Sequence, residues 1–337
     1  MKNLLLPSSN HKVQSSKFNV QCFLEEWNNS SGTVLVHTSG STGEPKQMLV
    51  EKRRMLASAR ITCDFLGLRK GDTALLCMSL DYIAGKMMVV RALERDLRLI
   101  AVEPSGHPLA AANFQLAFAA MVPMQVWNTL QVPEERERLM QIRHLIIGGG
   151  AIDDALAAEL KTFPNVVWST YGMTETLSHI ALRRLSGPEV SDWYTPFDSV
   201  RLSLSDEGCL IIDAPEVCPE PLVTNDIAEL RPDDRFRILG RKDNVICSGG
   251  IKIQAEELER QLCSHLRAPY MITKRPDPKF GELVVLLTEG SIDEACQVCE
   301  RILPKYHQPR AYVHVEHIPL TETGKPARKE AQRLAIK

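Results

Sequence analysis

The sequence predicts an α/β protein, with a large N-terminal domain of helix-flanked sheet that includes a small β subdomain, and a mobile α+β C-terminal domain. Three observations support this fold class. Short β-branched or apolar runs alternate with helix-length segments from residue 32 to about 169. After Gly187 the sequence becomes rich in strand-forming residues and in proline. Gly240 to Asp243 then precede a region with its own predicted strands and helices. With 337 residues, 44% of them hydrophobic, the chain can bury more than one core.

The first part of the chain alternates between strand and helix patterns, which indicates a parallel sheet flanked by helices. The predicted strands are 33–37, 73–78, 97–102, 144–147 and 166–169. The predicted helices are 52–66, 84–94, 109–121 and 153–163, the last of them capped by Asp153 or Asp154. Residues 1–31 are polar and irregular apart from a short amphipathic piece around Phe23 to Trp27, so we expect a lead-in that packs on the larger body.

The second part of the chain predicts smaller units. Strands at 199–205 and 209–213 flank an Asp-Glu-Gly turn, and prolines crowd residues 215–232. Beyond residue 244, helices are predicted at 255–266 and 293–303 and strands at 283–287 and 311–315. The predicted boundaries are a lead-in 1–31, an N-terminal domain 32–239 with its β subdomain at 187–239, a hinge 240–243 and a C-terminal domain 244–337.

The composition argues for small-molecule partners. Forty basic and forty-two acidic side chains leave a formal charge of -2, which favours neither nucleic acid nor anionic lipid. The leucine run within Met1 to Pro7 is too short for a signal peptide or a membrane span, so we expect a cytoplasmic protein without membrane insertion. The Cys296-x-x-Cys299 pair lacks a second pair for zinc, which favours two small residues on one helix face.

The segment from Thr38 to Lys46 has the chemistry of a polyphosphate cradle. It contains four hydroxyl side chains and two glycines, and it ends in a lysine. Glycines let backbone N-H groups approach phosphate oxygens, hydroxyls add hydrogen bonds, and lysine adds a positive charge. It is not a Walker A loop, because Pro45 stands where glycine is required and Gln47 where Ser or Thr would bind magnesium. A Ser/Gly-rich loop alone would more often be a flexible connection.

The run Ser-Gly-Ser-Thr-Gly-x-Pro-Lys in this segment resembles the signature loop of the adenylate-forming superfamily, which includes the acyl-CoA synthetases, luciferases and peptide-synthetase adenylation domains. The resemblance implies that this loop binds the β and γ phosphates of ATP. Its nucleotide-binding residues would be Thr38, Ser39, Gly40, Ser41, Thr42, Gly43 and Lys46.

The segment from Tyr171 to Glu175 is similar to the family's aromatic-Gly-x-Thr-Glu motif. By that likeness Tyr171 lies against adenine, Thr174 reaches the α-phosphate and Glu175 holds Mg²⁺, a hard cation that prefers carboxylate and phosphate oxygens. Alone, a Thr-Glu pair would more often start a helix. The same likeness adds Thr170 and Gly172 to the nucleotide contacts. Gly149 and Gly150 join them by a separate resemblance, to the family's glycine-rich floor of the adenine and acyl sites, although alone this stretch would be a strand-to-helix turn.

Three further matches follow along the chain. Asp226 resembles the family's ribose-binding aspartate, although Asn225 stands where glycine is usual; asparagine also tolerates left-handed backbone angles. The resemblance implies that Arg241 binds the ribose or phosphate edge and that Asp243 is the hinge about which the C-terminal domain turns. The coenzyme A channel would then be lined by Ser248, Gly249, Gly250 and Lys252.

Lys325 in a Thr-Gly-Lys sequence matches the family's C-terminal catalytic lysine, whereas a lone terminal lysine would usually be solvated.

The implied reaction has two steps. A carboxylate attacks the α-phosphorus of ATP, while Mg²⁺, Lys46 and Lys325 neutralise the phosphate charge, and the acyl group then passes to coenzyme A. The predicted catalytic residues are Lys325, Lys46 and Glu175.

Within the family, the short front of the chain and the sequences around Tyr82 and Glu103 look most like the compact 2-succinylbenzoate-CoA ligases of menaquinone biosynthesis. Such an acid has a spare carboxylate, which calls for a cation or strong donors in its pocket. The acyl-site residues predicted on this basis are Tyr82, Lys86, Gly149 and His179, with Arg183 a further candidate. For Lys86, a side chain that extends along apolar surface to solvent is an equal alternative.

Several alternatives stay open at this point. The chain could be another aryl- or acyl-CoA ligase, an adenylating enzyme that loads a carrier protein, or a non-catalytic nucleotide-binding module. Members of the family usually carry a further α/β lobe ahead of the phosphate loop, where this chain has only the lead-in. One wall of the acyl pocket and any homo-oligomer contacts built on that lobe are therefore undetermined.

Overall fold

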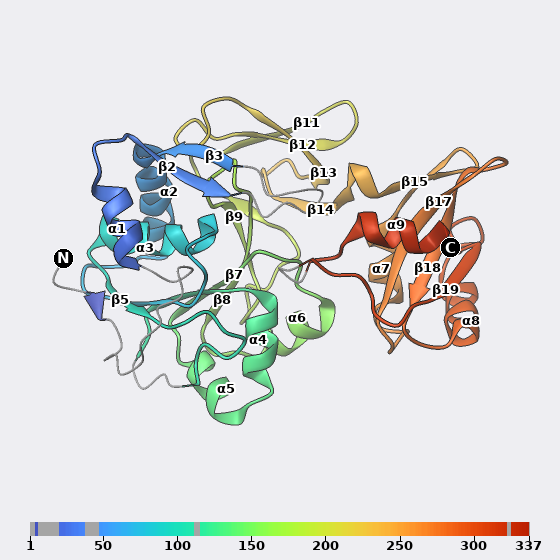
Figure 1. Cartoon of the computed structure of the whole chain (residues 1–337), viewed down its shortest axis with the longest axis horizontal. Helices are drawn as coiled ribbons and strands as arrows, with labels where there is room; N and C mark the ends of the chain where they lie inside the picture. The colour runs from blue at the N-terminus through green and yellow to red at the C-terminus, as the bar shows by residue number, and fades with distance from the viewer. Residues whose placement is uncertain (1–3, 6–19, 38–46, 111–114, 322–324, 337) are drawn as a thin grey trace.

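The computed structural model describes residues 4–5, 20–37, 47–110, 115–321 and 325–336. Figure 1 shows a large body in which helices flank a sheet, and a smaller body, formed by the C-terminal part of the chain, at the other end of the long axis. None of the described helices has the length and apolar character of a membrane span.

The main sheet confirms the predicted α/β class. It has eight strands in the order β1-β5-β4-β6-β7-β8-β9-β10. The strands from β1 to β8 in this order run parallel to one another. Strand β9 runs antiparallel to β8, and β10 runs antiparallel to β9. Their bounds are β1 Leu4–Leu5, β4 Thr73–Leu76, β5 Arg98–Ala101, β6 Phe118–Met121, β7 His144–Ile147, β8 Val166–Gly172, β9 His179–Arg184 and β10 Thr195–Pro196.

Helices cover both faces of this sheet. One face carries α1 (Val20–Asn28), α2 (Lys52–Phe65) and α3 (Ile83–Arg95), whose apolar side chains share one core. The other carries α4 (Pro123–Leu130), α5 (Pro133–Met140) and α6 (Asp154–Leu160), which share a second core. The cap predicted for α6 is confirmed at Asp153, whose Oδ1 accepts a hydrogen bond from the Leu156 N-H at 2.7 Å.

The predicted helix at 109–121 is wrong in all of its described residues, because 109–110 form a turn, 115–117 are not helical and Phe118–Met121 is the central strand β6. All four of its side chains are buried, so the strand shows no alternation of polar and apolar residues. Two of them are alanines, which favour helices. A short, continuous apolar run does not distinguish a buried strand from a helix, and here the sheet decides.

Two smaller sheets complete the large body. Strand β2 (Thr33–His37) pairs with β3 (Gln47–Glu51), a strand that the sequence reasoning missed, in a two-stranded antiparallel sheet. Four antiparallel strands form the β subdomain in the order β11-β12-β13-β14. They are β11 Arg201–Leu204, β12 Cys209–Asp213, β13 Leu222–Leu230 and β14 Phe236–Arg241.

The C-terminal body has a separate sheet, which follows the 3-10 turn η2 (Lys242–Asn244). Its strands are β15 Val245–Ser248, β16 Ile251–Gln254, β17 Tyr270–Asp277, β18 Gly281–Thr288 and β19 Ala311–His314. Helices α7 (Ala255–Leu262) and α8 (Ile292–Ile302) share one core with the sheet, while α9 (Arg328–Ile336) belongs to another. Helix α9 and strand β17 were not predicted.

Candidate active site

A cleft of about 1610 Å³ lies at the edge of the main sheet where the parallel strands β4, β6, β7 and β8 end. Strand β13, the end of β14 and the segment around Lys325 complete its walls. Ligands bind at the carboxyl ends of strands in open α/β sheets, because the connecting loops meet there. The position of the cleft follows from the sheet topology.

Ten of the predicted site residues line this cleft: Tyr82, Gly149, Thr170, Gly172, Thr174, Glu175, His179, Asp226, Arg241 and Lys325. They come from strands and loops that are distant in sequence, and the fold brings them together. Gly150, which follows Gly149, does not line the cleft. The predicted phosphate-loop residues Thr38, Ser39, Gly40, Ser41, Thr42, Gly43 and Lys46 lie outside the described residues.

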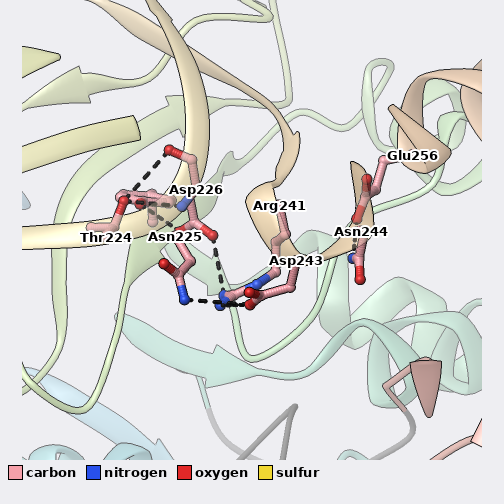
Figure 2. A network of polar contacts seen from close by, with 8 residues as sticks. Thr224, Asn225, Asp226, Arg241, Asp243, Asn244 and Glu256 are labelled. Atoms are coloured by element: carbon pink, nitrogen blue, oxygen red, sulfur yellow. Dashed lines mark hydrogen bonds and ion pairs between the residues drawn. The ribbon is translucent and has the colours of Figure 1, made fainter. Parts of the chain in front are cut away.

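Asp226 is held on two sides. The Tyr171 hydroxyl donates to its Oδ2 at 2.8 Å, and the Arg241 guanidinium donates to its Oδ1 at 3.2 Å. Asp226 and Arg241 face each other across β13 and β14, and Figure 2 shows Arg241 between Asp226 and Asp243. Each carboxylate oxygen can accept further hydrogen bonds, so Asp226 is fixed in place and still able to bind hydroxyl groups.

Tyr171 itself is not among the cleft-lining residues. Its ring packs edge-on against Phe236, with 5.1 Å between ring centroids. Burial, and then the charge of Asp226, raise the pKa of the Tyr171 hydroxyl, which stays protonated and donates to the carboxylate. In this structure Tyr171 orients Asp226, and the contact with adenine stays a prediction.

Gly172 and the residues after it form a tight connection between β8 and β9. A Cβ atom at Gly172 would lie 2.2 Å from the Ser178 carbonyl oxygen, so only glycine fits. The turn brings buried Thr174 and exposed Glu175 to the cleft. Among the described residues, no three His, Cys, Asp or Glu side chains gather as a metal site, so a magnesium ion would need phosphate and water ligands beside Glu175.

Lys325 reaches the cleft from the C-terminal body. Its backbone N-H donates to the Thr321 hydroxyl at 3.1 Å, and the Thr321 N-H donates to the Lys325 carbonyl at 2.7 Å, which fixes the backbone there. Burial, and then the positive charge of Arg241, lower the pKa of Lys325. Two cations therefore approach each other at the nucleotide side of the cleft, and an anion bound between them would relieve that repulsion.

Arg91 is a cleft residue that the sequence reasoning missed. It lies on α3, is 2% exposed, and donates to the Ser178 hydroxyl at 2.6 Å. Its Nε has no hydrogen-bond partner, and within the described part of the chain no carboxylate forms an ion pair with it. Burial lowers the Arg91 pKa to about 10, which leaves it charged at neutral pH. A buried guanidinium without a counter-charge is costly and indicates an anion-binding position.

His179 is buried beside Arg91 at the start of β9. Its Nε2 lies 3.2 Å from the Thr62 hydroxyl and its Nδ1 3.2 Å from the Ser178 hydroxyl. Burial, and then the charge of Arg91, hold the His179 pKa well below its usual value, so the imidazole is neutral. Both ring nitrogens of His179 therefore have protein partners, and the ring brings no charge to the cleft.

The structure corrects the expectations for Lys86 and Arg183, neither of which lines the cleft. The Lys86 ammonium is buried against α1 and β2, where it donates to Glu26 at 3.1 Å and to the Leu35 carbonyl at 2.9 Å. Lys86 therefore does not line the cleft, and its side chain is only 10% exposed. Arg183 lies over the Tyr194 ring, with the guanidinium carbon 5.4 Å from the ring centroid.

The predicted hinge and channel residues lie just beyond the cleft. The Asn225 amide donates to Asp243 at 3.3 Å, so the asparagine found in place of the usual glycine contacts the expected hinge residue (Figure 2). Gly249 and Gly250 have φ values of 59° and 85° in the turn that follows Ser248, and Lys252 is exposed on β16. The roles of these residues in a second reaction step stay predictions.

Comparison with known proteins places this cleft in a family. The family model described as AMP-binding enzyme matches residues 6–219, which is more than half of the chain. The chain belongs to the AMP-binding enzyme family. Its class is that of the AMP-forming CoA ligases.

Similarity to individual members of the AMP-binding family extends over most of the chain. A 2-succinylbenzoate-CoA ligase from Bacillus cereus is 25% identical over 348 residues, which cover 92% of this chain and 71% of that protein. The crystal structure of an acyl-CoA synthetase (AMP-forming)/AMP-acid ligase II-like protein from Dyadobacter fermentans is 32% identical with a TM-score of 0.64. That match covers 92% of this chain and 91% of the other.

A third member of the AMP-binding family shares the fold at lower identity. The o-succinylbenzoate-CoA synthetase from Bacillus subtilis, in complex with its acyl-adenylate intermediate, superimposes with a TM-score of 0.74 at 22% identity. The match covers 88% of this chain and 68% of that one.

The buried, neutral His179 should make stability depend on pH. On unfolding, the ring regains a pKa near 6.5 and binds a proton that the folded protein excludes, so stability is lost as pH falls below that value. We expect His179→Gln to reduce the slope of unfolding free energy against pH between 6.5 and 5 by up to about 1.4 kcal/mol per pH unit. Urea unfolding at several pH values measures both slopes, and equal slopes would contradict a neutral His179.

Proposed function

We propose that this enzyme activates an aromatic dicarboxylic acid of the 2-succinylbenzoate type with ATP and transfers the acyl group to coenzyme A. The observation that carries the choice of acid is Arg91, a buried cation on the cleft wall without a carboxylate partner in the described chain. A fatty acid would leave that charge uncompensated, whereas the spare carboxylate of a dicarboxylic acid would pair with it. The name of the Bacillus cereus relative supports the same substrate class.

The cleft residues fall into two chemical groups. Asp226, Arg241, Thr174 and Lys325 offer the carboxylate, hydroxyl and cations that suit a ribose and phosphates. The acid would meet a different set, in which Arg91 supplies a positive charge, the neutral His179 ring forms part of the wall, and apolar side chains supply packing for a ring. These apolar lining residues include Met121, Ile146 and Leu177.

In the first step, the substrate carboxylate attacks the α-phosphorus of ATP and forms a bond through its oxygen, and the bond to pyrophosphate breaks. The carboxylate is already ionised at neutral pH, so no general base is required. The enzyme contributes position and charge: Asp226 holds the ribose, and Lys325 donates to the oxygens on which negative charge develops. Burial and then the charge of Arg241 lower the Lys325 pKa, and a phosphate bound nearby would favour the charged ammonium again.

Magnesium fits this site as a companion of the nucleotide. Glu175 offers one exposed carboxylate at the cleft, and it would hold the ion together with phosphate oxygens and water. When bound, the ion would neutralise part of the charge on the phosphates.

In the second step, the thiol of coenzyme A attacks the acyl carbon and AMP leaves. Ser248, Gly249 and Gly250 lie outside the cleft while Lys325 lines it, which suits an arrangement for the first step. We infer that rotation about Asp243 exchanges these groups between the two steps.

The activity is tested by exchange of radiolabelled pyrophosphate into ATP. We expect exchange that depends on an added acid, strongest with aromatic dicarboxylates and weaker with aryl monocarboxylates and fatty acids. Lys325→Ala should lower the exchange rate by about 10² to 10³, because it removes a charge that stabilises the transition state.

The exchange experiment also separates the rival functions. A preference for a fatty acid or an aryl monocarboxylate would contradict the proposed dicarboxylate substrate. It would still support an enzyme that forms acyl-adenylates. Absence of exchange with every acid would indicate a nucleotide-binding module without catalysis. Supplying free coenzyme A or a carrier protein as the acceptor then identifies the thiol.

Replacing Arg91 tests the choice of acid directly. We expect Arg91→Met to lower kcat/KM for the dicarboxylate about 100-fold, since a buried charge pair contributes about 2 to 5 kcal/mol. The KM for ATP should change little. The kcat/KM for a monocarboxylate such as benzoate should also change little, because benzoate has no second carboxylate to pair with Arg91.

Arg183→Met is the matched control for Arg91→Met. It removes another guanidinium near the site, one that packs on Tyr194 and does not line the cleft. The dicarboxylate preference should survive in that variant. Equal losses for dicarboxylate and monocarboxylate in Arg91→Met would show that Arg91 supports the fold and does not bind the spare carboxylate.

A further inference from the structure

Strand β2 ends where the Thr38 to Lys46 motif begins, and its two edges have different neighbours. One edge pairs with β3 through the ladder that joins Thr33 to Glu51 and His37 to Gln47. The other edge has no strand partner over Thr33 to Val36 within the described residues, and its peptide groups need other hydrogen-bond partners.

Two side chains from distant parts of the sequence satisfy the peptide groups of Leu35 on that edge. The Leu35 N-H donates to Glu26 Oε1 at 3.1 Å, and the Leu35 carbonyl accepts from Lys86 Nζ at 2.9 Å. Glu26 Oε2 and Lys86 Nζ also form an ion pair at 3.1 Å. Glu26 belongs to α1 and Lys86 to α3, so the pair connects both helices to β2 (Figure 1).

The surroundings make this pair stronger than an ordinary surface ion pair. The Lys86 side chain is 10% exposed and that of Glu26 is 32% exposed. The Lys86 ammonium also lies 5.1 Å from the centroid of the Phe23 ring. Charged hydrogen bonds in a partly buried position are worth more than neutral ones, and removing one partner leaves the other unsatisfied.

The same pair fixes the position of β2 relative to the active-site cleft. Two residues after Leu35, His37 forms a parallel bridge with Tyr82, which immediately precedes α3. Both His37 and Tyr82 line the cleft. A shift of β2 relative to α3 would therefore move the cleft wall and the starting point of the Thr38 to Lys46 motif together.

We propose that Glu26 and Lys86 are positioning residues for ATP, because together they hold the Leu35 peptide and so set the place where the phosphate-binding motif begins. This inference rests on the proposed function in that it takes Thr38 to Lys46 to bind the triphosphate. It gives Lys86 a different role from the one expected from the sequence. Loss of Lys86 should weaken the binding of ATP and leave the binding of the acid unchanged.

The test is MgATP binding by calorimetry together with KM values for ATP and for the acid in the exchange assay, all on the full chain. We expect Lys86→Met to weaken MgATP binding and raise the KM for ATP about tenfold or more, as for loss of a charged hydrogen bond, with the KM for the acid within about twofold. Glu26→Gln should have a smaller effect in the same direction, because glutamine can still accept from the Leu35 N-H. Lys86→Arg should restore most of the affinity.

Lys274→Met provides a matched control. Lys274 also donates to a backbone carbonyl, that of Val245 at 2.8 Å, and pairs with Glu282 at 3.1 Å, but it lies in the C-terminal sheet. Its loss should leave MgATP binding unchanged. If Lys86→Met does not fold, as judged by its thermal midpoint, Glu26→Gln carries the comparison.

The outcomes separate this proposal from the proposed function. Unchanged ATP affinity in the folded Lys86 and Glu26 variants, an equal loss in Lys274→Met, or a rise in the KM for the acid alone would overturn the positioning role. A wild-type protein that binds MgATP but exchanges no pyrophosphate would overturn the ligase function, and the binding measurements would still decide the role of the pair. A wild-type protein that binds no MgATP would overturn both.

Discussion

A buried positive charge without a carboxylate partner in the described chain is the constraint on which this active site depends. Arg91 is almost fully buried and forms no ion pair there, and burial and then the charge of Arg241 lower the pKa of Lys325 in the same cleft. Such arrangements cost stability, because a buried charge has lost its hydration. They are understandable if the proposed substrates, a nucleotide and a dicarboxylic acid, bring negative charge to the cleft.

The fold supplies the precision that these charges require. Parallel strands end at one edge of the main sheet, so Thr170, Gly172 and Gly149 reach the cleft from adjacent strands. Asp226 is fixed by Tyr171 and by Arg241, its cross-strand partner on the adjacent strand β14. The Leu35 peptide is fixed in the same way by Glu26 and Lys86. In both places a part-buried polar contact between distant parts of the sequence fixes a strand that reaches the cleft.

The sequence predicted the features that depend on local chemistry. The alternating strands and helices and the Asp153 cap follow from short-range patterns, and the motif residues that line the cleft follow from the family resemblance. It did not predict β6, because a buried run of Phe118 to Met121 has no alternation to identify it as a strand. Nor did it find Arg91. On α3, Lys86 and Arg91 are five residues apart and point to different faces, and only the packing shows that Arg91 meets the cleft while Lys86 meets β2.

A crystal structure of the protein with MgATP and an aromatic dicarboxylic acid would test the central claim most directly. The account predicts the ribose hydroxyls on Asp226, one carboxylate of the acid near the α-phosphorus and Lys325, and the second carboxylate paired with Arg91. A second carboxylate exposed to solvent and remote from Arg91, or a nucleotide bound outside the cleft, would contradict it.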